Sequence, residues 1–529
     1  MQTPRELELP KKFKFWRDGQ YEVIEDICQS DKGVYLLDAP AGIGKSLIGV
    51  AVYSKIAMAK AVLDRMVGRE ARYRCIYVTR TKQLQNQLLR EFPMAKSVKG
   101  RSNYPCLAQP EALTAEDCFK PDTCSFFAAC PYRIARAEAA SAPLAVLNDA
   151  YFLAETNGEF LGRFSGANLV VLDEVDSIEG ALMNYIQFTV SEMQLKRLQL
   201  EPPKDLSARA EWFPWASRTS FQINEYCSSL SSKLEFLDDK AWSDIEIGMQ
   251  KQLTHLTNFS RKLAIFIGLV NENWIFSYAQ EEKGWRVTFK PVLVAEYADA
   301  YLWRHGSRFL GMSATIFDPN ILASDIGLTE WGYCQLDSPF PVENRPIYYQ
   351  PAANLRRSSM DQELPKLAEA VSGILDKYPE SRVLVHTVNY RIRDYLVGVL
   401  PQQQRLMTHS TEDRDEKLKT FSTSGEPLVM ISPSFDRGVS LDQEACRCII
   451  ICKVPYLDMS DEQVRARMSM PDGQRWYNLR AAQTLVQMSG RAVRSKDDYC
   501  DTYILDRQFE RLLARTRHIL PKWWLEAIR

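Results

Sequence analysis

The residues with the clearest chemical potential lie in Val34–Gly49, which reads VYLLDAPAGIGKSLIG. The opening apolar run predicts a buried parallel strand, the small residues after it predict a tight loop, and the spacing from Leu47 onward predicts a helix. Glycines let such a loop approach an anion closely, and the loop amides and the helix N-terminus point at it. The segment therefore predicts a phosphate-binding loop, against the alternative of an ordinary glycine-rich turn. Its candidate nucleotide-binding residues are Ala41, Gly42, Ile43, Gly44, Lys45 and Ser46.

Lys45 and Ser46 are expected to hold the charged end of the nucleotide. A lysine at this position reaches the terminal phosphates, and the serine hydroxyl ligates Mg²⁺. The pattern G-x-x-x-x-G-K-[ST] is met except at its first glycine, where Ala39 stands. Alanine suffices there, because that corner needs only a negative φ.

Two carboxylates follow a second apolar run, in Asn168–Glu174 (NLVVLDE). At the end of a strand, Asp173 can hold Mg²⁺ and Glu174 can orient or deprotonate the attacking water. Strands that end in Asp-Glu are common, and without a second motif the two carboxylates usually have only a structural role. After a phosphate-binding loop, however, the pair favours nucleotide hydrolysis.

Gln487, Arg491 and Arg494 lie in the segment QMSGRAVR, with the i, i+4, i+7 spacing of one helical face. Arginines presented by a second lobe can stabilise transition-state charge at the γ-phosphate when the lobes close. The alternative is a solvated basic face.

Further polar residues could contact a base or a nucleic-acid strand. Gln20 stands in the first turn of an expected helix, where its amide could read an adenine edge, although an ordinary polar residue at a helix start fits equally well. Arg74–Thr79 (RCIYVT) predicts a strand, and Thr79, Arg80 and Thr81 would lie at its carboxyl end, where hydroxyls and an arginine suit a phosphodiester backbone.

Cys106, Cys118, Cys124 and Cys130 have the spacing C-x11-C-x5-C-x5-C. Four thiolates in one short segment can close around a [4Fe–4S] cluster or a Zn²⁺ ion, or can simply be reduced cysteines. Structural zinc usually pairs cysteines two to four residues apart, so the wider spacing favours the iron–sulfur cluster.

The elements that must position these residues form an α/β pattern. Residues 144–153 predict a short strand and turn, 177–283 a long helical stretch ending in a hairpin at 281–284, and 338–349 a proline-rich linker. Within the helical stretch, Trp212, Phe213 and Trp215 favour core packing over base stacking. Further strands are expected at 308–315, 383–386, 428–432, 446–453 and 501–505.

Composition limits the classes of function. The 529 residues are enough for about three or four units. The 66 basic and 67 acidic residues nearly cancel, so a nucleic-acid contact must come from a local groove. No apolar leader and no apolar run of membrane-spanning length is visible, so we expect no membrane partner, a cytoplasmic location and twelve reduced cysteines.

In their joint order, the motifs resemble those of superfamily 2 helicases, and more narrowly the iron–sulfur helicases of the XPD/DinG family, closest to the DinG branch. The matching segments are APAGIGKS, YVTRTKQLQNQ, GRSNYPC with the cysteines, DEVD at Asp173–Asp176, MSATI, SPFPVENR, VLVHT, SFDRGVSLD and QMSGRAVR. The resemblance strengthens the iron–sulfur interpretation and places Arg17 with Gln20 in the motif on the adenine side.

The resemblance implies an α/β fold of two RecA-like lobes with parallel sheets, an inserted iron–sulfur domain and a mainly helical Arch domain. The expected boundaries are 1–97, 140–182 and 285–336 for lobe 1, 98–139 for the cluster domain, 183–284 for the Arch domain and 337–529 for lobe 2.

The implied activity is that of an ATP-dependent DNA helicase that moves 5′ to 3′ on single-stranded DNA and unwinds tailed duplexes, forks or R-loops. ATP, Mg²⁺ and a [4Fe–4S] cluster would be its cofactors, and it would act as a monomer. The alternatives are a nucleic-acid-stimulated ATPase that strips RNA or proteins, and a nucleotide- or redox-switched binding module. Departures from the family pattern stand at Asp176, where a histidine is common, and at Arg437, Ser440 and Cys500.

Overall fold

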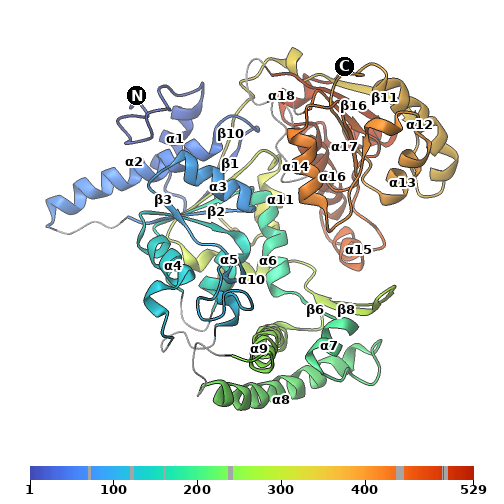
Figure 1. Cartoon of the computed structure of the whole chain (residues 1–529). Helices are drawn as coiled ribbons and strands as arrows, with labels where there is room; N and C mark the ends of the chain where they lie inside the picture. Colours follow the sequence, from blue (N-terminus) through green and yellow to red (C-terminus); the bar gives the residue numbers. More distant parts are fainter. Residues whose placement is uncertain are drawn as a thin grey trace.

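Two α/β lobes lie beside each other, and a pair of long helices projects below them (Figure 1). The computed structural model describes residues 1–68, 73–118, 124–158, 162–235, 242–435, 446–490, 493 and 498–529. Both large sheets are parallel throughout, so the expected α/β fold with two parallel-sheet lobes is confirmed.

Lobe 1 is built on a seven-stranded sheet in the order β10-β1-β9-β5-β2-β4-β3. Its central strands are buried on both faces, which is why they read as continuous apolar runs in the sequence. Because β9 lies between β1 and β5, the carboxyl ends of these three strands are neighbours. The strands are β1 (Val34–Asp38), β2 (Cys75–Thr79), β3 (Ala95–Ser97), β4 (Leu144–Asn148), β5 (Leu169–Asp173), β9 (Phe309–Ser313) and β10 (Gly332–Gln335).

The helices of lobe 1 differ from expectation in two places. The turn expected after β4 is instead helix α5, which Asn148 caps by accepting a hydrogen bond from the Tyr151 amide at 2.7 Å. Helix α2 is long and apolar enough to cross a membrane by length and composition, contrary to the expectation from sequence, yet its first ten residues pack largely inside lobe 1. The helices are α1 (Gln20–Gln29), α2 (Lys45–Met66), α3 (Lys82–Glu91), α4 (Pro131–Ser141), α5 (Asp149–Thr156), α6 (Ile178–Ile186), α10 (Ala295–Tyr301) and α11 (Pro319–Asp325).

Lobe 2 has a six-stranded sheet in the order β11-β16-β15-β12-β14-β13. The strands are β11 (Ile347–Ala353), β12 (Val383–His386), β13 (Leu406–Met407), β14 (Val429–Ser432), β15 (Cys448–Ile451) and β16 (Asp501–Asp506). The helices are α12 (Met360–Leu375), α13 (Tyr390–Val399), α14 (Arg414–Thr423), α15 (Glu462–Met468), α16 (Gly473–Ser489), α17 (Gln508–Thr516) and α18 (Lys522–Leu525).

The linker expected at 338–349 is shorter than predicted. Strand β11 already begins at Ile347, and the Pro346 carbonyl accepts a hydrogen bond from the Thr502 amide at 3.0 Å. Proline lacks only the amide hydrogen, so its carbonyl can still join a sheet at the start of an edge strand.

The segment between the lobe 1 strands β5 and β9 is not purely helical. It contains α7 (Glu192–Leu198), α8 (Arg209–Glu235) and α9 (Asp244–Leu269), and an antiparallel sheet in which β6 (Phe188–Ser191) and β7 (Ile275–Glu281) flank β8 (Gly284–Lys290). The expected hairpin is β7–β8, and β6 is a third strand that the sequence did not indicate.

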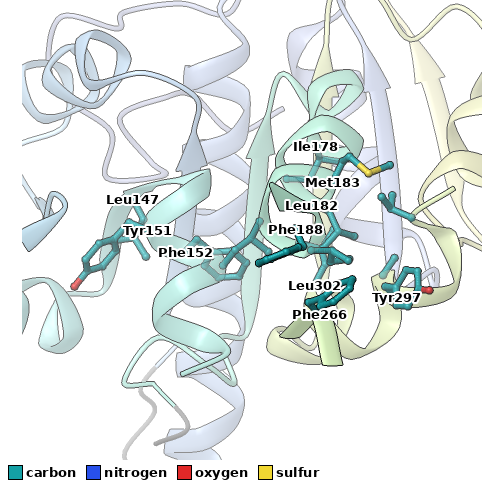
Figure 2. Packing of buried hydrophobic residues seen from close by; sticks show 14 of the residues in the cluster. Leu147, Tyr151, Phe152, Ile178, Leu182, Met183, Phe188, Phe266, Tyr297 and Leu302 are labelled. Atoms are coloured by element: carbon teal, nitrogen blue, oxygen red, sulfur yellow. The ribbon is translucent and has the colours of Figure 1, made fainter. Parts of the chain in front are cut away.

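This segment shares a continuous core with lobe 1. Figure 2 shows Leu182 of α6 close to Phe188 of β6 and Phe266 of α9. Trp212 and Trp215 are also buried in that core, as expected, whereas Phe213 is exposed.

Candidate active site between the two lobes

The phosphate-binding loop follows β1 and leads into α2. Gly42 and Gly44 have φ values of 79° and 94°, in the left-handed region that favours glycine. A Cβ atom at Gly44 would stand 2.8 Å from Nε2 of Gln20, so the loop also leaves no room for a side chain there. The ammonium of Lys45 donates to the Ala39 carbonyl at 3.2 Å, which holds it over the loop. Ala39 is not among the described residues of positive φ, in agreement with the tolerance expected for alanine.

Gln20 and Arg17 brace this loop. The buried Gln20 donates from Nε2 to the Ile43 carbonyl at 2.6 Å and accepts from the Arg17 amide at 2.8 Å. The Arg17 guanidinium donates to the Gly42 carbonyl. Both side chains therefore lie at the loop, and the bonds of Gln20 use its amide oxygen and one of its amide hydrogens.

Asp173 and Glu174, which we call the carboxylate box, lie beside the loop at the end of β5. Burial and the neighbouring Glu174 carboxylate raise the pKa of Asp173 to about 7, and Lys45 acts in the opposite direction. Glu174 has a φ of 57°, so the chain turns sharply into the short 3-10 helix η4 (Val175–Ser177). The structure thus brings Lys45 and Asp173 together, within electrostatic range of each other.

Asp38 is a further carboxylate of this site that the sequence argument missed. It ends β1, accepts a hydrogen bond from the Phe317 amide at 2.8 Å, and is buried, which raises its pKa to about 6. Its position directly before the loop, in an otherwise apolar strand, was the available signal.

Asp176 connects the carboxylate box to both β9 and lobe 2. Its carboxylate accepts from the Ser313 hydroxyl at 2.7 Å, from the Thr315 hydroxyl at 3.3 Å and from Nε2 of Gln487 at 3.2 Å. Gln487, on α16 of lobe 2, also donates to the Thr315 hydroxyl oxygen at 2.8 Å. A carboxylate therefore stands where the resemblance made a histidine common, and it joins the box to the MSATI segment.

Of the residues expected on one helical face, only Gln487 lies on the described helix. Helix α16 ends at Ser489, and Arg491 and Arg494 lie outside the described residues. Arg437 and Ser440 also lie outside them. Cys500 is described, and it is buried directly before β16.

The residues expected to contact nucleic acid lie at the carboxyl end of β2. Thr79 is buried, and Thr81 caps α3 by accepting from the Leu84 amide at 3.3 Å. Only Arg80 of the three is exposed. Burial raises the pKa of the neighbouring Asp149, and the charge of Arg80 acts in the opposite direction. Among these three, Arg80 alone presents its side chain to solvent.

The four cysteines lie on an irregular segment between β3 and α4, and all four are partly buried. Cys106 follows a 3-10 turn, Cys118 ends another, and Cys130 is the N-cap of α4. Four thiols are a suitable donor set for iron or zinc. Among the described residues, however, no three histidine, cysteine or acidic side chains are gathered to hold a metal ion, so the geometry does not supply the site that the spacing predicts.

Comparisons with known proteins agree with this architecture. Residues 372–527 match the family described as Helicase C-terminal domain. The solved structure "XPD_Helicase" superimposes with a TM-score of 0.67 over 97% of this chain and 99% of that one, at 16% identity, a level at which likeness shows the fold alone. The chain is therefore similar to XPD in fold, and its residues 372–527 match a helicase domain.

Two curated relatives match shorter parts of the chain. The XPD helicase subunit of the general transcription and DNA repair factor IIH from Dictyostelium discoideum is 28% identical over 122 residues, 21% of this chain and 15% of that protein. The ATP-dependent DNA helicase DinG from Photobacterium profundum is 23% identical over 266 residues, 44% of this chain and 37% of that protein. The chain thus matches well under half the length of either relative.

Proposed function

We propose that this chain is an ATP-dependent DNA helicase that moves 5′ to 3′ on single-stranded DNA and unwinds tailed duplexes, forks or R-loops. The observation that carries the proposal is the network of Asp176, Thr315 and Gln487, because it joins the carboxylate box of lobe 1 to a helix of lobe 2. A nucleotide site that spans two lobes can convert hydrolysis into relative movement of the lobes. The names of the XPD and DinG relatives support the assignment to DNA.

Each residue of the site has a role that its position supports. The amides of Gly42 and Gly44 cradle the phosphates, and the Lys45 ammonium moves from the Ala39 carbonyl to the γ-phosphate. Mg²⁺, held by Ser46 and Asp173 when bound, neutralises charge on the phosphate oxygens.

Hydrolysis itself needs an oriented water and stabilised charge. Glu174 orients the attacking water, and the Ser313 hydroxyl lies 3.4 Å from its carboxylate oxygen, which limits where that carboxylate points. We assign to Arg491 and Arg494 the stabilisation of the negative charge that develops on the phosphate in the transition state. They follow Gln487 by four and seven residues.

We propose further that Cys106, Cys118, Cys124 and Cys130 bind a [4Fe–4S] cluster. Support comes from the thiol donor set and from its wide spacing, C-x11-C-x5-C-x5-C. A visible absorption spectrum with iron and sulfide analysis of anaerobically purified protein tests this. About four irons per chain are expected, and zinc or no metal contradicts the assignment.

The remaining assignments belong to the same proposal. The chain acts as a cytoplasmic monomer. The DNA strand passes the carboxyl end of β2, where Arg80 contacts it and Thr79 and Thr81 hold the backbone beneath it. The boundaries at 97, 139, 182, 284 and 336 separate the lobes from the two inserted domains. Sedimentation of the protein alone and with single-stranded DNA tests the monomer.

Lys45→Ala tests the helicase directly. We expect loss of ATP hydrolysis with retained binding of single-stranded DNA, because the lysine is assigned to the nucleotide phosphates and not to the DNA strand. Lys60→Ala is the matched control on the same helix, since Lys60 is half-exposed and pairs only with Asp64 in the structure. ATP hydrolysis by Lys45→Ala at the rate of the unmodified chain contradicts the site.

Strand displacement on 5′-tailed and 3′-tailed duplexes tests the activity and its direction. Displacement from the 5′-tailed duplex alone is expected. DNA-stimulated hydrolysis without displacement from either duplex would refute unwinding. It would favour the alternative of an ATPase that moves along the strand and strips RNA or proteins from it.

A further inference from the structure

Four charged side chains meet at the contact between the lobes, behind the carboxylate box. Lobe 1 contributes Glu179 of α6 and Asp325 of α11, and lobe 2 contributes Arg467 of α15 and Arg480 of α16. Their side chains are only 10%, 6%, 6% and 13% exposed, in that order. We call these four residues the interlobe charge cluster.

The interlobe charge cluster is a closed ring of ion pairs. Arg467 pairs with one oxygen of Glu179 and one oxygen of Asp325, and Arg480 pairs with the other oxygen of each. All four carboxylate oxygens are therefore used, and two positive charges balance two negative ones. Arg467 also lies over the Trp476 ring, 4.1 Å from its centroid, which fixes the guanidinium plane.

Such a cluster fixes geometry more than it adds stability. Desolvation of buried charges offsets most of their attraction, whereas the bidentate fork of arginine accepts only a narrow range of positions. The ring can close in one arrangement of α15 and α16 against α6 and α11. It therefore sets how lobe 2 is seated on lobe 1.

Arg480 connects this ring to the carboxylate box, and Arg467 does not. The Nη1 atom of Arg480 donates to the main-chain carbonyl of Asp176 at 3.2 Å and to Oε1 of Gln483 at 3.2 Å. Gln483 in turn donates to the Thr315 carbonyl at 2.7 Å. The guanidinium therefore holds the main chain at the end of the turn that carries the two acidic residues of the box.

That turn needs external support. Glu174 has a φ of 57°, a left-handed conformation that is strained for a residue other than glycine. Helix α6 begins at Ile178, directly after this turn, and the contact of Arg480 with the Asp176 carbonyl fixes the turn from one side. The strand β5 fixes it from the other side.

We propose that Arg480 is a positioning residue for nucleotide hydrolysis, which holds Asp173 and Glu174 in place only while lobe 2 is seated on lobe 1. The inference rests on the proposed function. The position of lobe 2 thus affects the carboxylate box in two ways. One is the contact of Arg480 with the Asp176 carbonyl, and the other is the pair of contacts that Gln487 makes with Thr315 and Asp176.

Two charge-balanced double variants separate positioning from mere support of the fold. Arg480→Gln with Glu179→Gln removes the contact with the Asp176 carbonyl, while Arg467 and Asp325 keep their ion pair. Arg467→Gln with Glu179→Gln removes the same number of charges from the same ring, and Arg480 keeps Asp325 and the Asp176 carbonyl.

We expect the Arg480 pair of substitutions to lower kcat for ATP roughly tenfold to 100-fold with KM little changed, because a misplaced reacting group loses rate and not binding. The Arg467 pair is expected to keep kcat within about threefold of the unmodified chain. The melting temperatures of the two double variants should fall by similar amounts. Equal kcat in both double variants, or a rise in KM alone, overturns the inference.

Arg480→Lys provides a second test of the inference if the Arg480 double variant does not fold. It keeps the net charge of the ring, but one ammonium cannot reach both carboxylates and the Asp176 carbonyl, so a similar loss of kcat is expected. Unchanged kcat in this folded variant also overturns the inference. An unmodified chain that hydrolyses no ATP refutes the proposed function itself, and the inference with it.

Discussion

Replacing Asp176 with alanine is expected to break the link between the carboxylate box and lobe 2. Asp176 is buried and accepts hydrogen bonds from Ser313, Thr315 and Gln487. A hydrogen bond to a charged group contributes about 1.5–3 kcal/mol, so a simple sum over three donors gives roughly 5–9 kcal/mol. That sum is too large, because two of the three donors retain partners.

The remaining partners reduce the expected loss. Gln487 keeps its 2.8 Å bond to the Thr315 hydroxyl, and the hydroxyls of Ser313 and Thr315 lie 3.3 Å apart, close enough to pair with each other. The short 2.7 Å bond from Ser313 to the carboxylate is the main term that is lost. We therefore expect a loss of about 2–3 kcal/mol.

Steady-state ATP hydrolysis with saturating single-stranded DNA measures this loss. If the coupling acts in the transition state, about 2–3 kcal/mol lowers kcat roughly 30- to 150-fold. Asp176→Asn is the matched variant: it keeps an oxygen that can accept from Ser313, so a decrease of no more than about tenfold is expected. A folded Asp176→Ala variant with kcat within about threefold of the unmodified chain would refute the reasoning.

Three further predictions address packing, pH and metal. Gly49→Ala should lower the free energy of unfolding, measured in denaturant, by about 1–3 kcal/mol, because the new methyl would stand 3.1 Å from the Tyr77 ring. Gly180→Ala is the control and should not lower it, because the space around Gly180 is open. Burial, aided by the charge of Arg304, lowers the pKa of His305 to about 4, so the unfolded chain takes up the proton first. Stability should therefore fall as pH drops from about 6.5 to about 4, and this fall should be smaller in His305→Gln when melting temperatures are compared. Cys124→Ser should lower iron per chain while ATP hydrolysis persists, and unchanged iron content contradicts a role for this thiol as a ligand.

The parts of the site that could be predicted are those encoded by local sequence. The phosphate-binding loop and the carboxylate box each follow an apolar strand directly, and a parallel strand buried on both faces has a recognisable composition. Their proximity follows from one rule, that ligands bind at the carboxyl ends of parallel strands.

What could not be predicted depends on residues far apart in the chain. Glu179 and Arg467 are separated by 288 positions, and each reads as an ordinary charged residue on a helix until the lobes meet. Strand β6 was missed for the same reason, because its partner β8 lies about a hundred residues later. The end of α16 at Ser489, with Gly490 as its C-cap, could not be predicted from periodicity alone.

The strand order of lobe 1 also governs when this lobe can form during synthesis. Strand β1 pairs with β9 and β10, which come after both insertions, so the sheet around the phosphate-binding loop stays open at one side until then. The roughly 300 residues from Val34 to Gln335 take about 15–60 s to translate at about 5–20 residues per second. Until β9 has been made, late in that interval, the apolar β1 segment has neither of its neighbours. A growing chain of this design keeps an apolar strand of its nucleotide lobe unpaired for much of its synthesis, a condition that favours aggregation.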